Sequence, residues 1–168
     1  MSAPGIRPIV DHALEWLLVA LMSLMVVNVL WQVASRFLLN NPSSFTEEVA
    51  RYLLVWVGLL GGAYAVGKRI HLAIDLFPSK LEGRRKRILE LFIELCIFVF
   101  AALVLLGGGA GLVWLTLDLG QTSAALQIPL GFVYLVLPLS GILMMFYAGS
   151  HAASAVRALQ GSQDGEPA

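Results

Sequence analysis

Four long apolar stretches, separated by short polar segments, dominate the chain. They cover about residues 14–39, 49–66, 89–117 and 130–148. Because an α-helix rises about 1.5 Å per residue, each stretch is long enough to cross the roughly 30 Å hydrocarbon core of a bilayer. The pattern therefore predicts an all-α integral membrane protein with four transmembrane helices.

The polar segments set the expected domain boundaries. Residues 1–13 form a short polar lead, residues 14–158 form the four-helix transmembrane domain, and residues 159–168 have the composition of a disordered tail. The third helix should be the longest. If it is helical from about residue 83 to residue 117 it measures roughly 52 Å, so its first turns should project beyond the bilayer.

Proline and glycine predict local features of the helices. Pro129 suits the first turn of the fourth helix, and Pro138 should kink that helix because proline has no backbone N–H. Glycines four residues apart allow close approach of helices in lipid. Two such pairs predict packing seams, Gly58 with Gly62 and Gly107 with Gly111.

Basic residues indicate how the helices are oriented. The linker 118–129 contains no lysine or arginine, whereas seven of the eleven lie between the second and third spans: Lys68, Arg69, Lys80, Arg84, Arg85, Lys86 and Arg87. Cytoplasmic loops carry the excess of lysine and arginine. We therefore expect both termini in the cytoplasm, and the loops 39–46 and 118–129 on the outer side.

Composition excludes several function classes. Charged residues make up 13% of the chain and hydrophobic residues 58%, whereas soluble domains carry about 25% charged residues. The net charge is zero, which gives no basic field for nucleic acid. The single cysteine, Cys96, allows neither an intrachain disulfide nor a thiolate metal cluster. We expect no metal site and no cofactor.

Four charged residues flank the first outer loop: Arg36, Glu47, Glu48 and Arg51. Charges near hydrocarbon are costly and should pair. The favoured interpretation is a structural ion-pair cluster that closes the first helix hairpin. The alternative is a contact surface for an external partner. Because no nucleophile or metal ligand stands nearby in the sequence, catalysis is not expected and the chain is not interpreted as an enzyme.

Histidines at the opposite face suggest a competing function. His71 and Asp75 are four residues apart, and His12 and His151 also fall at the inner ends of helices. A haem- or quinone-binding membrane anchor of a respiratory enzyme could use His71 and His151. A hydrogen-bonded His71–Asp75 pair that fixes the inner loop is favoured, because basic neighbours make His71 a poor ligand for a metal cation.

The middles of the spans contain no Asp, Glu, Lys or His. Such residues mark translocation sites in secondary transporters. The chain alone is therefore not expected to carry a polar solute through itself. A self-assembling channel or small exporter is a further, less favoured interpretation.

Several sequence fragments occur together in a characteristic order. They are VASRFLLN, EEVARYLLVW and G-x-x-I-H-L-x-I-D within residues 33–75, and SAALQIPLGFVYLVLPLSG at residues 123–141. Over about residues 29–150 this set resembles the small, DctQ-like membrane subunit of tripartite ATP-independent periplasmic (TRAP) transporters. The positions that match the family pattern are Arg36, Glu47, Glu48, Arg51, Trp56, His71, Asp75, Pro129 and Pro138.

The resemblance implies a multi-pass subunit of the bacterial inner membrane with no enzymatic activity. Such a subunit is a scaffold for a large membrane subunit, which carries the substrate and sodium sites. A periplasmic binding protein delivers an organic anion, such as a carboxylate or a sugar acid. The expected partners are therefore these two proteins and membrane lipids. The resemblance leaves open the substrate, and whether Glu47 and Glu48 contact the binding protein.

Overall fold

The computed structural model describes residues 6–38, 44–69 and 83–161. Four helices in this part of the chain are long and apolar enough to cross a membrane: Arg7–Phe37, Phe45–Lys68, Ile88–Asp118 and Leu130–Val156. The prediction of an all-α protein with four spans is confirmed. His71 and Asp75 lie outside the described residues.

The spans are built from consecutive helical elements. They are α1 (Ile6–Phe37), α2 (Ser44–Lys68), α4 (Gly83–Phe100), the π-helix η2 (Ala101–Gly108), α5 (Gly109–Asp118), α6 (Leu130–Tyr134) and α7 (Val136–Gly161). The third span runs from α4 through η2 to α5 without interruption, which confirms that it is long. The helix α1 begins eight residues before the predicted start of the first span.

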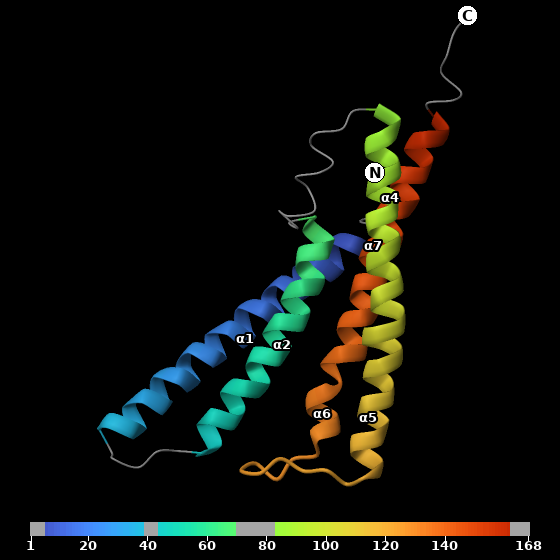
Figure 1. Cartoon of the computed structure of the whole chain (residues 1–168). Helices are drawn as coiled ribbons and strands as arrows, with labels where there is room; N and C mark the ends of the chain where they lie inside the picture. Colours follow the sequence, from blue (N-terminus) through green and yellow to red (C-terminus); the bar gives the residue numbers. More distant parts are fainter. Residues whose placement is uncertain (1–5, 39–43, 70–82, 162–168) are drawn as a thin grey trace, which may run out of the picture.

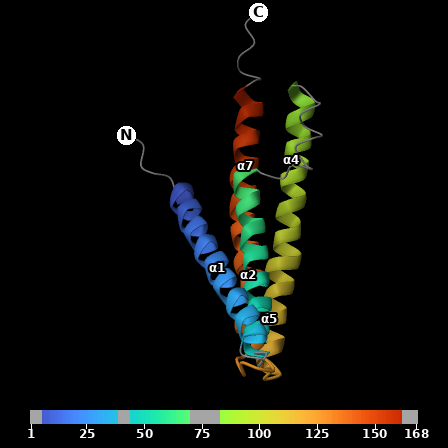
Figure 2. The same cartoon turned by 90° about the vertical axis from the view of Figure 1, so that its left-hand side faces the viewer.

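The helices form two hairpins that meet at one end. The first hairpin is α1 with α2, and the second combines α4, η2 and α5 with α6 and α7 (Figure 1). Helix α2 packs on both α1 and α7, and α4 packs on α7. Figure 1 shows the hairpins diverging towards the end that carries the loop after α5, and Figure 2 shows the tilt of α1 in a second view.

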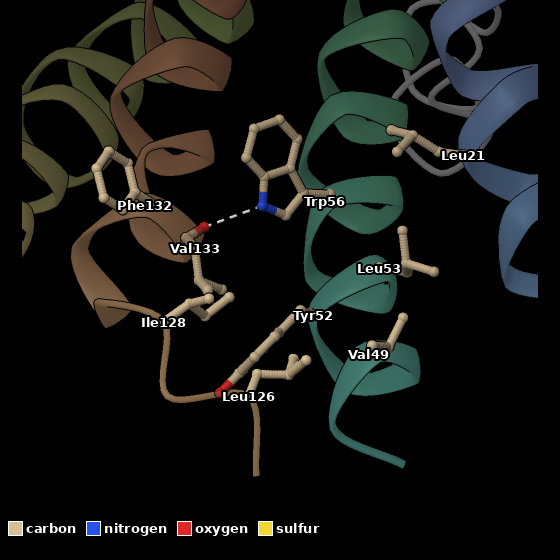
Figure 3. A pocket seen from close by; sticks show the side chains of 9 residues that line it. All are labelled: Leu21, Val49, Tyr52, Leu53, Trp56, Leu126, Ile128, Phe132 and Val133. Carbon is tan, nitrogen blue, oxygen red and sulfur yellow. Dashed lines mark hydrogen bonds between the residues drawn. The ribbon is translucent and has the colours of Figure 1, made fainter. Parts of the chain in front are cut away.

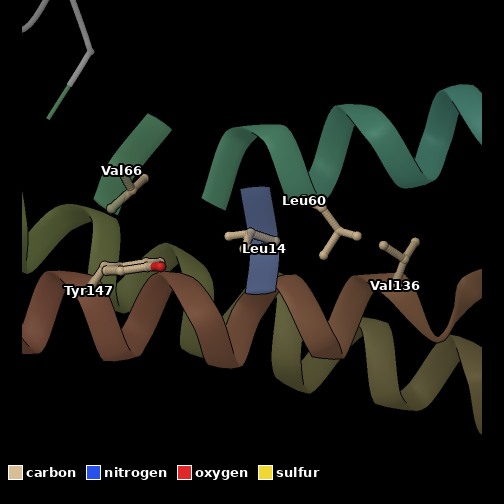
Figure 4. Close-up of a cluster of buried hydrophobic side chains, with 5 residues drawn as sticks. All are labelled: Leu14, Leu60, Val66, Val136 and Tyr147. Carbon is tan, nitrogen blue, oxygen red and sulfur yellow. The ribbon is translucent and has the colours of Figure 1, made fainter. Parts of the chain in front are cut away.

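The buried core lies where the two hairpins meet. Leu14 of α1, Leu60 and Val66 of α2, and Val136 and Tyr147 of α7 form one cluster of buried side chains (Figure 4). Most other apolar side chains of the spans are exposed. In a soluble protein this would be unfavourable, but lipid tails are as apolar as these side chains. The core therefore fixes only one end of the bundle.

The fourth span is interrupted near Pro138. Helix α6 ends at Tyr134 and α7 begins at Val136. Proline cannot donate a hydrogen bond to the carbonyl four residues earlier, which here belongs to Tyr134. The helix is therefore interrupted where the sequence predicts a kink. Pro129 is the residue immediately before α6, with φ of −60°.

Glycine packing agrees with the prediction only in part, because a Cβ on Gly62 would lie 3.2 Å from the Met144 side chain of α7. A Cβ atom on Gly58 or Gly111 would meet no atom within 4 Å, so neither residue lines a helix contact in the described structure. Among the described glycines, an added Cβ would come closest to the backbone of another helical element at Gly141. A Cβ there would lie 2.9 Å from the Leu106 nitrogen and 3.1 Å from the Ala101 oxygen, both in η2. Spacing alone identified small residues but not the direction in which each one points.

This difference leads to a test of packing. We expect Gly141→Ala to destabilise the protein by about 1–3 kcal/mol, because the new methyl group would overlap backbone atoms that have no freedom to move aside. Gly58→Ala is the matched control and should cost nothing. Thermal unfolding of both variants in mild detergent would measure the difference, and equal melting temperatures would contradict the packing described here.

Candidate functional site

Glu48 holds the loop between the third and fourth spans. Its carboxylate accepts hydrogen bonds from three consecutive backbone N–H groups, of Ala124 at 3.1 Å, Ala125 at 2.8 Å and Leu126 at 3.0 Å. The Tyr52 hydroxyl donates a fourth bond, 2.6 Å long. We call these five residues the Glu48 cluster. Hydrogen bonds to an ionised acceptor are the strong ones, so this cluster fastens the loop to the first turns of α2.

The loop is shaped so that these N–H groups point the same way. The N–H of Ser123 donates to the Ile128 carbonyl at 2.9 Å, and the N–H of Leu130 donates to the Gln121 carbonyl at 2.9 Å. Gln127 has a φ of +56°, a left-handed backbone conformation that residues other than glycine rarely adopt. The result is a short, closed loop that presents its tip to Glu48.

The predicted ion-pair cluster forms only in part. Arg51 contacts Glu47 at 3.3 Å, with both side chains about two-thirds exposed, and such surface pairs contribute little. Arg36 is exposed and pairs with neither glutamate. The first hairpin is joined instead by Asn28, whose side-chain amide donates to the Thr46 carbonyl at 2.8 Å. Glu48 instead accepts hydrogen bonds mainly from backbone N–H groups. The pattern of charged residues in a sequence does not indicate such partners.

Trp56 links α2 to the fourth span. Its indole N–H donates to the Val133 carbonyl at 3.0 Å, close to the interruption between α6 and α7. In lipid, a backbone carbonyl near a helix interruption needs a donor from elsewhere in the protein. Trp56 supplies one. Of the residues that match the family pattern, the structure therefore brings Glu48, Trp56 and Pro129 to the same loop and helix junction.

A second polar cluster lies at the opposite end of the helices, around a buried histidine. The Nδ1 atom of His151 lies 3.1 Å from Glu94 Oε1, and its Nε2 atom lies 2.6 Å from an Arg7 nitrogen. His151 is 3% exposed and Glu94 is 8% exposed. Arginine can only donate hydrogen bonds. The Nε2 atom must therefore accept, and Nδ1 carries the proton that His151 donates to Glu94.

Neighbouring charges extend this arrangement across all four spans. Arg69 lies 3.8 Å from Glu94, and Lys68 lies 3.6 Å from Asp11. Asp11 also accepts a 2.6 Å hydrogen bond from the Tyr147 hydroxyl. These contacts join α1, α2, α4 and α7 through a set that we call the Glu94 cluster: Arg7, Asp11, Lys68, Arg69, Glu94, Tyr147 and His151.

The Glu94 cluster explains why α1 begins early. Arg7 donates to the Gly67 carbonyl at 2.9 Å as well as to His151, so the first turn of α1 is held by contacts with α2 and α7. The Glu94 cluster was not predicted from the sequence. Its members are polar residues at the ends of apolar helices, which is a usable signal, but their pairing across the fold depends on tertiary structure.

The geometry also bears on the haem alternative. Both ring nitrogens of His151 already have partners, Glu94 and Arg7, so neither is free to ligate iron. Within the described ranges, no group of three or more His, Cys, Asp or Glu residues could hold a metal ion. His71, the other residue invoked for that function, lies outside these ranges. The structure therefore does not favour a haem anchor.

Comparisons with known proteins match most of the chain to one family. A family model described as "Tripartite ATP-independent periplasmic transporters, DctQ component" matches residues 25–158. The sialic acid TRAP transporter small permease protein SiaQ of Vibrio cholerae is 31% identical over 81% of this chain and 82% of its own length. A putative TRAP transporter small permease protein of Haemophilus influenzae is 27% identical over 80% of this chain and 82% of its own.

A third relative has a different organisation. The isethionate TRAP transporter permease protein DctMQ of Oleidesulfovibrio alaskensis is 32% identical over 85% of this chain but over only 24% of its own length. In that protein the similar segment is part of a much longer polypeptide. The family match covers Glu48, Glu94 and His151, whereas Arg7 and Asp11 lie before the matched residues.

Proposed function

Since the chain belongs to the DctQ-component family of tripartite ATP-independent periplasmic transporters, we propose that it is the scaffold on which a large permease subunit moves an organic anion. It is a small permease subunit, and a multi-pass protein of the bacterial inner membrane. The family is a transporter component and not an enzyme family.

The observation that carries the scaffold proposal is the distribution of charge. In the part of the chain that the structure describes, the charged side chains lie near the ends of the spans, and the Glu48 and Glu94 clusters satisfy several of them internally. A path for a polar solute needs polar groups at the middle of the membrane. The middles of these described helices carry no charged side chain, which supports a role in holding another subunit.

A large permease is the partner that we propose. In the DctMQ relative, the segment similar to this chain and the rest of the permease belong to one polypeptide. The two are therefore present in equal numbers in that protein. A subunit made as a separate chain must reach the same arrangement by contact between helices. The exposed apolar faces of the four spans offer the surface for such contact, with lipid on the remainder.

The substrate that we propose is an organic anion delivered by a periplasmic binding protein. Relatives are named for sialic acid and isethionate, which carry a carboxylate and a sulfonate. Uptake that is independent of ATP needs another source of energy, and we propose a sodium gradient. Neither the anion nor the ion is expected to bind within this chain.

We further propose that both termini are cytoplasmic, because seven lysines and arginines lie between the second and third spans and none lies between the third and fourth. The Glu48 cluster then faces the periplasm. Because the Glu48 carboxylate is engaged within the chain, a binding protein would meet the exposed Glu47–Arg51 pair and the outer surface of the loop. At the cytoplasmic face, a His71–Asp75 pair remains our proposal for fixing the second loop.

Affinity purification tests the scaffold proposal directly. We expect the tagged chain, extracted from its native membrane in mild detergent, to recover a large multi-pass permease in constant ratio. Recovery of the chain without such a partner would contradict the proposal. An absorption spectrum of the same sample tests the haem alternative, because bound haem would produce a strong Soret band.

A further inference from the structure

Two irregular segments of the second hairpin lie against each other. The π-helix η2 interrupts the third span, and the break between α6 and α7 interrupts the fourth. A Cβ atom on Gly109, immediately after η2, would lie 2.7 Å from the Leu137 Cβ and 3.1 Å from the Pro138 nitrogen. Sharp kinks in helices occur mainly at prolines and at π-type turns. Both spans of this hairpin are therefore interrupted at the same level.

Hydrogen bonding at the end of η2 permits more than one helical pattern. The Gly109 N–H points to three carbonyls, those of residues 104–106. These carbonyls lie three, four and five positions earlier, which corresponds to 3₁₀, α and π bonding. Because the donor is shared among them, a small change of direction between α4 and α5 leaves the N–H with a partner.

Beyond the two interruptions, α5, the loop over residues 119–129 and α6 form one connected body, which we call the loop unit (Figure 1). An added Cβ on Gly131 of α6 would lie 2.4 Å from the Leu117 Cγ of α5, so the two helices are in close contact. The Gln121 N–H donates to the Thr116 carbonyl at 3.0 Å, which fixes the start of the loop to α5. We therefore expect the loop unit to move as one body.

Hydrogen bonds join the loop unit to α2 at two points in the part of the chain that the structure describes. Next to the interruption, Trp56 donates to the Val133 carbonyl at 3.0 Å, and Figure 3 shows this bond. At the far end, Glu48 accepts from the three loop N–H groups. Between these points an open apolar groove of about 400 Å³ separates α2 from α6. The Glu48 bonds therefore restrain the loop end of the unit.

We propose that the loop unit pivots about η2 and the break before Pro138, and that Glu48 holds it against α2. The Glu94 cluster lies on the other side of the interruptions and keeps its place during this movement. Helix α5 has 10 residues and is about 15 Å long. A change of about 20° in direction, the size of a sharp kink, therefore moves the loop by about 5 Å.

Distances between pairs of spin labels test the pivot in the full chain, reconstituted in lipid nanodiscs with the native Cys96 replaced by alanine. One label is attached at the exposed Leu54 of α2, and the other at the exposed Leu119 that follows α5. Glu48→Ala removes the acceptor of all four hydrogen bonds. We expect it to change the distance between the labels, or to widen its distribution, by about 5 Å.

A second substitution tests whether this movement depends on the interruption. Pro138→Ala supplies an N–H that can donate to the Tyr134 carbonyl, so the fourth span becomes continuous. Added to Glu48→Ala, it should return the label distance most of the way to that of the unmodified protein. Pro129→Ala is the matched control, because Pro129 lies at the other end of α6, and it should leave the movement unchanged.

Four results would overturn the proposal. The label distance could stay the same in Glu48→Ala, or its change could persist when Pro138→Ala is added. A label at Gln127 in the loop could move while the label at Leu119 does not, which would show release of the loop alone. The distance from the α2 label to one at the exposed Phe92 of α4 could change equally, which would show separation of the whole hairpins.

Discussion

Replacing Glu48 with glutamine will release the loop over residues 121–130 from α2 and reduce uptake by the assembled transporter several-fold. The carboxylate accepts four hydrogen bonds, three of them from backbone N–H groups. Glutamine keeps one acceptor oxygen but replaces the other with an NH₂ group, which cannot accept from a backbone N–H. At least one of the N–H groups therefore loses its partner.

Two measurements separate the steps of this prediction. Hydrogen exchange of the amides from Ala124 to Leu126 should accelerate in Glu48→Gln, and substrate uptake in cells should fall. Glu47→Gln is the matched control for the exchange measurement, because among the described residues the Glu47 side chain contacts only Arg51, at an exposed position, and exchange of the three amides should stay near that of the unmodified protein. Unchanged exchange in Glu48→Gln would refute the role given to this carboxylate.

The second large effect is expected at His151. Replacement by phenylalanine fills the space but leaves Glu94 and Arg7 without their shared partner. Removing one member of a buried, hydrogen-bonded charged set costs about 2–5 kcal/mol. We therefore expect His151→Phe to lower the melting temperature of the detergent-solubilised protein by roughly 10 °C.

The same substitution at another histidine provides the control. His12 is exposed and contacts Trp16 within its own helix, so His12→Phe should leave the melting temperature nearly unchanged. His151→Gln should recover part of the loss, since an amide side chain can both accept from Arg7 and donate to Glu94. Equal melting temperatures for His151→Phe and His12→Phe would show that the Glu94 cluster does not stabilise the fold.

The features that were predicted correctly from the sequence are those that depend on a single segment of the chain. The four spans follow from the lengths of their apolar stretches, and the interruption before Pro138 follows from a missing N–H. The long third span is also a property of uninterrupted helical sequence. The π-helix within it has no comparable signal, and the residues Ala101–Gly108 were predicted only as part of a helix.

Sequence reasoning failed where a partner lies far along the chain. Glu48 binds backbone atoms more than seventy positions away, and backbone amides are identical in every residue except proline. Glu94 and His151 are 57 positions apart. The packing of Gly141, and the lack of packing at Gly58, depend on how each helix is rotated about its axis. The hydrophobic periodicity of a helix identifies its apolar face, but not the helix that packs against that face.

The two clusters together suggest how a small subunit holds its shape. The Glu94 cluster joins four spans at one end, and the Glu48 cluster ties the diverging hairpins at the other. Between them the contacts are mostly apolar, and Trp56 adds its hydrogen bond to the Val133 carbonyl. Such an arrangement suits a fixed support for a moving partner, because the polar ties resist sliding of one hairpin past the other.

Reconstitution into liposomes tests the central claim, that this chain supports transport without conducting the substrate itself. Vesicles are prepared with the chain alone, with the large permease alone, and with both, and a loaded binding protein is added to each. We predict uptake of the organic anion only in vesicles that contain both subunits. Uptake by the chain alone, or undiminished uptake by the large permease without it, would contradict the account.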